Sequence, residues 1–384
     1  MKILVAPCAY KGTIQASALA QAIALGIEES LEESLEESLK NRARPVQVKL
    51  APVADGGDDT LACLKLALPG EFVSKTVSGP TSKPVNAAFF LLDKLAVVEL
   101  AQASGIAHLQ EEQLAPLQAN TFGTGQIVEL AIEAGAREIV IMLGGSASTD
   151  GGSAILSALG AKFTDINGAP LLTDSTVCGG GQLLSIAHID LGPLRRKTAG
   201  IKFLIATDVV NPLLGSDGAA AIFAPQKGAT REQVLYLDEC LAHFAGALEL
   251  ASTQKISLRC HAGAGAAGGA GFGLALGLGA QFTSGFHWLA AKTNLSEKLE
   301  WCDLVVVAEG CLDGQSLSGK ATGEILSLAN AAGKKVIALP ACSQLNAEQE
   351  QLFAAIIPTA NSSELATLDS VRQAAQLIIE LANI

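Results

Sequence analysis

Aromatic and charged residues are both scarce in this chain. Only 4% of its 384 residues are aromatic, with two Trp and two Tyr, and 17% are charged. Hydrophobic residues make up 49%, which excludes disorder, because so apolar a chain buries enough surface to offset the entropy lost on ordering. The 39 glycines and the length indicate an α/β protein rich in Ala, Leu and Gly, with two domains.

An excess of positive charge is also lacking. The chain has 26 Lys and Arg against 38 Asp and Glu, which gives a formal net charge of −12. Phosphate backbones and anionic lipid surfaces select basic proteins, so the composition argues against a nucleic-acid or membrane partner. Any anionic substrate must therefore be bound by local hydrogen-bond donors or cations, which oppose the negative electrostatic field of the whole chain.

The eight cysteines lack the spacing of a metal site, because none forms a Cys-x-x-Cys pair. Their scatter indicates reduced, mostly buried thiols, and the first residues run straight into a strand-like stretch without a secretion leader. We therefore expect a cytoplasmic protein, and the oligomeric state stays open. Residues 261–291 carry no Asp, Glu, Lys or Arg, but their many glycines and polar interruptions predict a buried loop and helix rather than a membrane span.

Two catalytic signatures are missing as well, and one cofactor signature is incomplete. Neither Gly-x-x-x-x-Gly-Lys-Ser/Thr nor Gly-x-Ser-x-Gly occurs, so a P-loop kinase and a Ser hydrolase are not supported. The run from Gly263 through Gly265 to Gly269 matches Gly-x-Gly-x-x-Gly, yet no acidic residue follows before Glu297 to hold a ribose. Close backbone packing or contact with a nucleotide phosphate is favoured over NAD binding.

Short, continuously apolar runs are present in place of these motifs. Such runs are typical of strands buried on both faces of a parallel sheet, and helical stretches alternate with them. The expected strands are residues 2–7, 46–53, 96–100, 138–143, 202–206, 304–308, 335–339 and 354–358. The expected helices include residues 17–39, 124–134 and 322–332.

Five of these strands are followed by loops that combine glycine with a carboxylate or hydroxyl group. Because open α/β sheets bind ligands at the carboxyl ends of their strands, these loops predict a functional site. They are residues 8–13, 54–60, 144–152, 207–212 and 309–316. In the third loop, the backbone of Gly144, Gly145 and Ser146 has the glycine content needed to converge its N–H groups on an anion, although a tight turn needs only part of it.

Carboxylates recur in the glycine-rich loops, namely Asp55, Asp150, Asp208 and Asp313, and Lys11 supplies a cation after the first strand. Phosphoryl transfer uses a carboxylate to hold Mg²⁺, another to accept a hydroxyl proton, and a cation to neutralise the moving charge. Each Asp taken alone could equally cap a helix or close a turn.

These loops, in this order, resemble the bacterial glycerate kinase family, whose members include glycerate 2-kinases of glyoxylate and sugar-acid breakdown. The family's patterns are similar to residues 7–13, 54–60, 144–152, 208–215, 225–229, 263–269 and 309–320 of this chain. The likeness extends from Met1 to about Pro340.

The resemblance implies a Rossmann-like parallel-sheet α/β domain at residues 1–78 plus 292–384, with a second α/β domain inserted at 79–291 and the active site in the cleft between them. It further implies an alcohol-group phosphotransferase that uses MgATP and D-glycerate, with 2-phosphoglycerate as product. The implied catalytic residues are Lys11, Asp55, Asp150, Asp208 and Asp313. The implied binding residues are Gly144, Gly145, Ser146, Lys227, Ser104, Thr124, Gly263, Gly265, Ser316 and Lys320.

Within that set, Lys11 and Lys227 would neutralise phosphate or the substrate carboxylate. Asp208 or Asp313 would hold Mg²⁺, and Asp55 or Asp150 would orient the attacking hydroxyl. The chain departs from the family pattern at four positions, where Cys8 replaces Asp, Ala9 replaces Ser, Thr149 replaces Asn and Cys311 replaces Arg.

If the family's Asp and Arg pair with each other, losing both leaves no unpaired charge. Besides a glycerate kinase, three other interpretations stay open. They are a kinase for another small hydroxy acid, a ligand-binding relative with impaired catalysis, and an NAD-dependent dehydrogenase.

Overall fold

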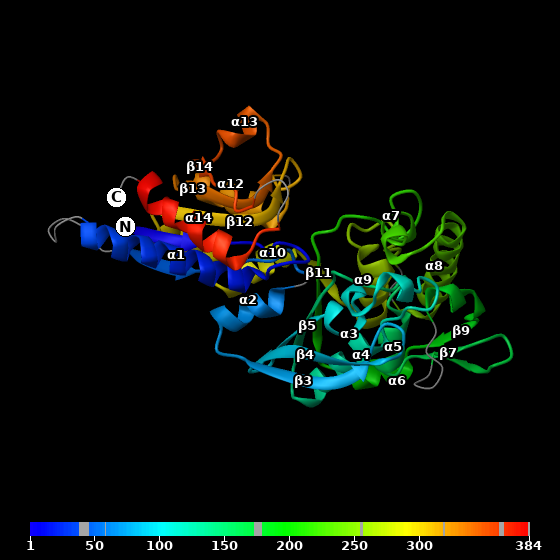
Figure 1. Cartoon of the computed structure of the whole chain (residues 1–384). Coiled ribbons are helices and arrows are strands. Elements are labelled where there is room, and N and C mark those ends of the chain that lie inside the picture. The colour runs from blue at the N-terminus through cyan, green and yellow to red at the C-terminus, as the bar shows by residue number, and fades with distance from the viewer. Residues whose placement is uncertain are drawn as a thin grey trace. The chain divides into compact units, whose positions relative to one another are not determined.

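The computed structural model describes residues 1–37 (side chains to residue 32), 46–57, 59–172, 179–253, 256–317, 319–360 and 365–382. The chain divides into two compact units, each an α/β structure (Figure 1). Unit 1 comprises Met1–Asp55, Ala62–Leu68 and Phe286–Ile384, and unit 2 comprises Gly56–Leu61 and Pro69–Gly285. Residues 71–78, which the sequence analysis placed in the first domain, form a strand of the unit 2 sheet.

Unit 1 contains a five-stranded parallel sheet in the order β14-β13-β12-β1-β2. Its strands are β1 (Lys2–Val5), β2 (Gln47–Leu50), β12 (Leu304–Leu312), β13 (Lys335–Ser343) and β14 (Ala355–Ile356). Its helices are α1 (Ala16–Glu37), α2 (Thr60–Ala67, in this unit from Ala62), α10 (Gly285–Lys292, in this unit from Phe286), α11 (Leu295–Trp301), α12 (Ala321–Ala331), α13 (Ala347–Glu350) and α14 (Leu368–Leu381).

Both faces of the unit 1 sheet are buried, which explains its unbroken apolar runs. Ile3 and Val5 of β1 belong to the core shared with α1 and α14, whereas Leu4 between them belongs to the core shared with α11 and α12. Successive side chains of a strand point to opposite faces, so a strand covered on both sides must be apolar at every position.

Unit 2 contains a six-stranded mixed sheet in the order β11-β10-β6-β5-β4-β3 and a three-stranded antiparallel sheet β8-β7-β9. The strands are β3 (Glu71–Ser78), β4 (Pro84–Leu92), β5 (Leu95–Glu99), β6 (Glu138–Met142), β7 (Lys162–Thr164), β8 (Pro170–Leu171), β9 (His188–Asp190), β10 (Lys202–Ala206) and β11 (Gln281–Thr283). The antiparallel strands β3 and β4 add an edge to an otherwise parallel sheet.

The α-helices of unit 2 are α3 (Ala101–Ser104), α4 (Phe122–Glu133), α5 (Ser153–Ala158), α6 (Gly192–Lys197), α7 (Ala219–Phe223), α8 (Arg231–Ala251) and α9 (Ala266–Leu278). Four short 3₁₀ turns are η1 (Ile106–His108), η2 (Glu111–Gln113), η3 (Gly180–Ser185) and η4 (Pro225–Lys227). A single core of buried residues from the six-stranded sheet and its helices holds this unit together.

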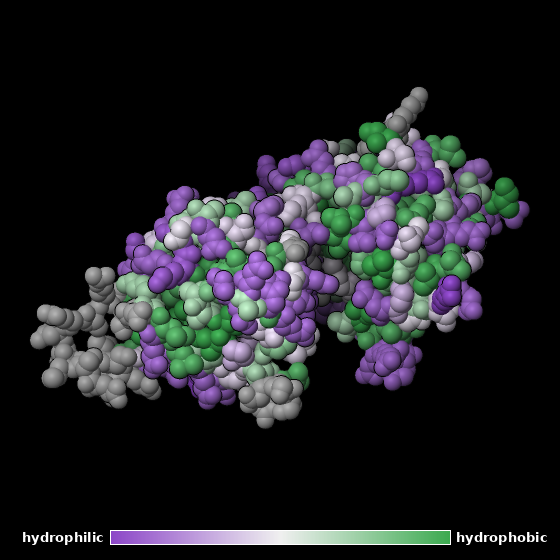
Figure 2. Space-filling model, turned by 90° about the horizontal axis from the view of Figure 1, so that it is seen from above, coloured by the Kyte–Doolittle hydropathy of each residue, from purple (hydrophilic) through white to green (hydrophobic). Residues whose placement is uncertain are grey.

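The α/β class expected from the sequence is confirmed, and all eight expected strands and three expected helices form. Residues 38 and 39, expected at the end of the first helix, lie outside the described residues. Hydrophilic and hydrophobic residues are interspersed on the face shown in Figure 2. No helix among the described residues combines the length and the apolarity needed to cross a membrane.

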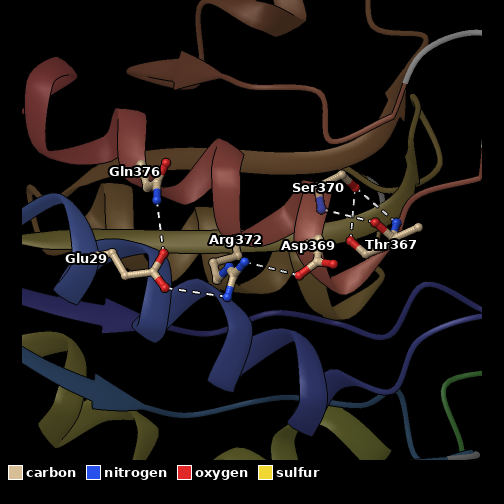
Figure 3. Close-up of polar contacts among 6 residues, drawn as sticks. All are labelled: Glu29, Thr367, Asp369, Ser370, Arg372 and Gln376. Carbon is tan, nitrogen blue, oxygen red and sulfur yellow. Dashed lines mark hydrogen bonds and ion pairs between the residues drawn. The ribbon is translucent and has the colours of Figure 1, made fainter.

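Helices α1 and α14 pack side by side on one face of the unit 1 sheet (Figure 1). Arg372 of α14 lies 3.5 Å from Glu29 of α1 and 3.3 Å from Asp369, and Gln376 donates a 3.0 Å hydrogen bond to Glu29 (Figure 3). These groups are partly exposed, so the ion pairs contribute little stability. Close backbone approach at Gly26 matters more, because a Cβ atom there would lie 2.2 Å from the Arg372 carbonyl oxygen.

We predict that Gly26→Ala lowers the free energy of unfolding by about 1 to 3 kcal/mol, the usual cost of overpacking, partly offset by the higher helix propensity of alanine. Gly246 in α8 is the matched control, because a Cβ there would lie 3.6 Å from the nearest atom, an Arg259 nitrogen. Gly246→Ala should leave stability equal or slightly higher. Denaturant unfolding of both variants measures the difference, and equal stabilities would contradict the packing argument.

Candidate functional site

In unit 1 the candidate residues gather at the carboxyl ends of β1 and β12. Tyr10 fixes the first loop: its buried hydroxyl donates to the Leu339 carbonyl oxygen at 2.7 Å, and its backbone pairs with Ile14. Lys11 follows at an exposed position in this turn, next to Gly12, whose φ of +78° suits glycine. The anchored Tyr10 therefore holds the turn in which Lys11 is exposed.

Asp55, near the start of the second candidate loop, lies at the N-terminus of α12. Its Oδ1 accepts a 2.7 Å hydrogen bond from the Ala321 backbone N–H, so the carboxylate caps the helix. The sequence analysis left open whether this Asp is a cap or a site residue. The structure shows that it caps α12, and its partly exposed side chain keeps a second carboxylate oxygen.

Glu309 on β12 is a partly buried carboxylate, which the sequence analysis did not single out within the motif of residues 309–320. It contacts the hydroxyls of Ser316 and Thr322, and its Oε2 has no hydrogen-bond partner among the described residues. Burial raises its pKa, the hydroxyl contacts and Lys320 lower it, and the nearby Asp55 raises it. The signal that could have found it is an acidic residue inside an otherwise apolar strand.

Asp313 closes the turn after β12. Its Oδ1 accepts from the Ser316 backbone N–H at 2.8 Å and from the Ser316 hydroxyl at 3.1 Å. The backbone bond is the main reason that the pKa of this carboxyl lies below its usual value. The buried Ser316 side chain therefore supports Asp313 rather than pointing away from the protein.

Cys8 occupies the family's Asp position and is close to several of these groups. Its sulfur accepts a hydrogen bond from the Thr322 hydroxyl at 3.4 Å. Burial, and to a lesser degree the charges of Asp55 and Glu309, raise its pKa far above the usual value of a thiol. These effects favour the neutral thiol of Cys8 over the thiolate that a nucleophile would need.

In unit 2 the candidate residues surround the glycine-rich loop 144–152 after β6. Asp150 is fully buried, and its Oδ2 accepts from the Thr121 backbone N–H at 2.9 Å and the Thr121 hydroxyl at 2.7 Å. Its Oδ1 accepts from the Gly152 N–H at 3.2 Å. Burial raises the pKa of Asp150 against these three bonds. The carboxylate thus braces the loop from inside.

Lys227, in η4, is buried beside the same loop. Its ammonium donates to the Ser146 hydroxyl at 2.8 Å and to the Ser148 carbonyl oxygen. Burial lowers its pKa to about 7, partly opposed by the negative charge of Asp150. A lysine with a pKa near neutrality can exchange a proton at physiological pH, which is common at functional sites.

Three hydroxyl groups of this loop region are buried without a hydrogen-bond partner among the described residues. They belong to Ser148, Thr149 and Ser153. Unpaired buried hydroxyls are costly, so they indicate a place where water or a ligand completes the hydrogen bonding. The hydroxyl-rich composition of residues 146–153 was the signal in the sequence.

Ser104 and Thr124 are brought together, with their side-chain oxygens 2.8 Å apart, and Thr124 also donates to the Leu100 carbonyl oxygen at 3.2 Å. Both are fully buried. The backbone of Ser104 accepts from the Ala147 N–H, so the pair supports the start of the glycine-rich loop.

Asp208, after β10, accepts a 3.1 Å hydrogen bond from the Gly285 N–H.

Close backbone packing explains the second glycine-rich run. A Cβ at Gly265 would lie 2.3 Å from the Pro212 carbonyl oxygen, and one at Gly268 would lie 2.1 Å from the Ser148 carbonyl oxygen. Gly263 has a φ of +91°, in the left-handed region. Of the two alternatives left open by the sequence, packing is therefore confirmed, and a contact with nucleotide phosphate stays a prediction.

The described residues contain no cluster of three or more metal-binding side chains. A hollow of about 330 Å³ in unit 1 lies apart from the candidate residues. It is lined by Lys49, Ala67, Leu68, Lys292, Thr293, Asn294, Glu297 and Lys298.

The buried Lys227 gives a stability prediction. The unfolded chain protonates this lysine below about pH 10.5, whereas the folded protein does so only below about pH 7. Between these values the unfolded state binds more protons, so the cost of burying Lys227 falls as pH rises. Relative to Lys227→Met, the wild type should gain up to about 1 kcal/mol per pH unit between about pH 7 and 9.

Denaturant unfolding at several pH values measures this difference. Lys94→Met is the control, since Lys94 is exposed and its removal should give a difference that does not change over the same range. A pH-independent difference for Lys227→Met would show that the lysine stays charged in the folded protein.

The whole chain is similar to known proteins of one family. The model of the glycerate kinase family matches residues 3–383. Glycerate 2-kinase from Escherichia coli (strain K12) is 37% identical over 341 residues, covering 88% of this chain and 84% of the relative. Glycerate kinase from Halalkalibacterium halodurans is 34% identical over 338 residues, covering 87% of each chain.

A solved structure is similar over the full length. The crystal structure described as glycerate kinase 2 from Salmonella typhimurium LT2 superposes with a TM-score of 0.81 at 31% sequence identity. The match covers 100% of this chain and 98% of that one.

Proposed function

This chain belongs to the glycerate kinase family, and from that membership we propose that it transfers the γ-phosphoryl group of ATP to a hydroxyl of D-glycerate. Membership makes the protein a kinase with a hydroxyl acceptor. The observation that carries the proposal is the match over residues 3–383, which includes every loop with a candidate residue. The product we propose is 2-phosphoglycerate, supported by the relative from Escherichia coli that is named glycerate 2-kinase.

We propose that Lys11 and Asp55 of unit 1 neutralise substrate charge and orient the attacking hydroxyl. The exposed Lys11 ammonium is available to neutralise a phosphate or the substrate carboxylate, because it has no ion pair among the described residues. Asp55 is better suited than Asp150 to orient the attacking hydroxyl, since Asp55 is partly exposed whereas both oxygens of Asp150 accept internal hydrogen bonds. Positioning of this kind lowers the barrier without a strong base.

We propose that the glycine-rich loop of residues 144–152 in unit 2 binds phosphate through the backbone of Gly144, Gly145 and Ser146. Lys227 then acts as a positioning residue that holds Ser146 and the Ser148 carbonyl, with Asp150 bracing the same loop. The unpartnered hydroxyls of the loop are further donors for an anionic group.

Mg²⁺ fits the residues present, because this ion needs one or two carboxylates and takes its other ligands from phosphates and water. The partnerless Oε2 of Glu309, together with Asp313, provides such oxygens in unit 1, and Asp208 provides one in unit 2. When bound, the ion neutralises the charge that develops on the transferred phosphoryl group. Which of these carboxylates hold it is part of the proposal.

The test is ADP release by the purified protein with MgATP and D-glycerate, with the phosphate position on the product read by ³¹P NMR. We expect turnover that needs both substrates and gives 2-phosphoglycerate. Phosphate on the third carbon would overturn the proposed product, and turnover only with another hydroxy acid would overturn the proposed substrate. Absence of turnover with D-glycerate and related hydroxy acids would overturn the kinase proposal for this chain.

Lys11→Met should lower kcat/KM about 100-fold, the order of magnitude found when one charge-stabilising donor is removed from a transition state. Lys335→Met is the matched control, because Lys335 is an exposed lysine of the same unit at the start of β13. Steady-state kinetics of the two variants make the comparison. Equal kcat/KM values would remove Lys11 from the proposed machinery.

A further inference from the structure

Two cysteines lie directly opposite each other near the carboxyl ends of β12 and β13. The parallel register of these strands pairs Cys311 with Cys342, and burial together with the neighbouring Cys342 thiol raises the pKa of Cys311 to about 11. Both are free thiols, as are the other described cysteines. Cys311 stands where the family has Arg, so this dithiol is not part of the family pattern discussed above.

The strand geometry suits a covalent bond between these two sulfurs. Neighbouring strands run about 4.8 Å apart, and residues paired in register project their side chains from the same face of the sheet. A disulfide needs Cα atoms about 4.4 to 6.8 Å apart. The spacing of two register-paired residues on neighbouring strands falls within that range.

Solvent access and a neighbouring thiol together distinguish this pair from the other described cysteines, of which Cys8 is also partly exposed. Cys342 is exposed and Cys311 is partly exposed, whereas Cys63, Cys240 and Cys302 are buried. Cys260 is also exposed, but it has no thiol partner among the described residues. Only the pair on β12 and β13 thus combines access with an adjacent second thiol in the described part of the chain.

We propose that Cys311 and Cys342 form a covalent modification site for small disulfides of the glutathione class. The Cys342 thiolate attacks one sulfur of the disulfide, so a mixed disulfide forms and one small thiol leaves. The Cys311 sulfur then loses its proton and attacks the Cys342 sulfur, which releases the second small thiol and forms the protein disulfide. Two protein thiols are oxidised, and one small disulfide is reduced to two thiols that carry the protons.

The modification site adjoins the candidate residues of unit 1. The Ser316 hydroxyl oxygen lies 3.2 Å from the Cys311 carbonyl oxygen and 3.1 Å from Asp313 Oδ1, and its single proton can be donated to either acceptor. A disulfide would therefore tie the base of this turn to β13. The inference rests on the strand register and on the solvent access of the two thiols, and it does not depend on the proposed kinase activity.

The experiment uses the full chain, fully reduced and then incubated with excess glutathione disulfide. Remaining thiols are alkylated, and intact mass and peptide mapping locate the products. We expect a peptide linked through Cys311 and Cys342 in most molecules, with the bond lost after dithiothreitol treatment. Cys311→Ser should leave Cys342 carrying a glutathionyl group, because the second attacking sulfur is missing.

Cys260 provides the comparison inside the same molecule, since an exposed thiol without a partner can end only as a free thiol or a mixed disulfide. Wild-type protein in which Cys342 remains glutathionylated would overturn the proposal, as would wild-type protein in which both thiols remain alkylatable. The wild-type readout is independent of how well the variant folds and of whether the protein turns over D-glycerate.

Discussion

Close contact between two backbone segments is the constraint on which unit 2 depends. The glycine run of α9 passes so near the loop after β6 that a Cβ at Gly268 would lie 2.1 Å from the Ser148 carbonyl oxygen, and one at Gly273 would lie 2.0 Å from that of Gly151. The Gly151 N–H also donates to the Gly268 carbonyl at 3.0 Å. This contact holds the glycine-rich loop in one conformation, so its polar groups are preorganised.

Burial of charge follows from that packing. Asp150 and Lys227 lie in the same tightly packed region, where hydrogen bonds from the backbone and from hydroxyl groups replace water. Desolvation raises the pKa of Asp150 and lowers the pKa of Lys227, because a charged group is disfavoured in a dry interior. A loop that binds a phosphate needs fixed donors, and a buried brace supplies that rigidity better than an exposed one.

In unit 1 the same need is met by a helix terminus and a turn. Asp55 caps α12 and Ser316 closes the turn around Asp313, so two candidate carboxylates are held by backbone N–H groups. Where the resemblance led us to expect Asp and Arg, the chain has Cys8, which is close to Asp55 and Glu309, and Cys311, which is paired in register with Cys342. Neither thiol is left as an unpaired charge, which explains how the fold accommodates both replacements.

The pattern of residues along the chain was enough to predict the α/β class, the eight strands named from apolar runs, and the strand-end loops, because burial on both faces of a sheet demands continuous apolar residues. The analysis did not predict the antiparallel edge strands: β3 mixes polar and apolar residues, and the apolar run at residues 87–92 of β4 was not singled out. Only the tertiary structure decided that Asp150 faces inward, that Lys227 reaches Ser146, and that Glu309 keeps a partnerless oxygen. These facts depend on which segments become neighbours across many residues of chain, and spacing along the sequence carries no record of that.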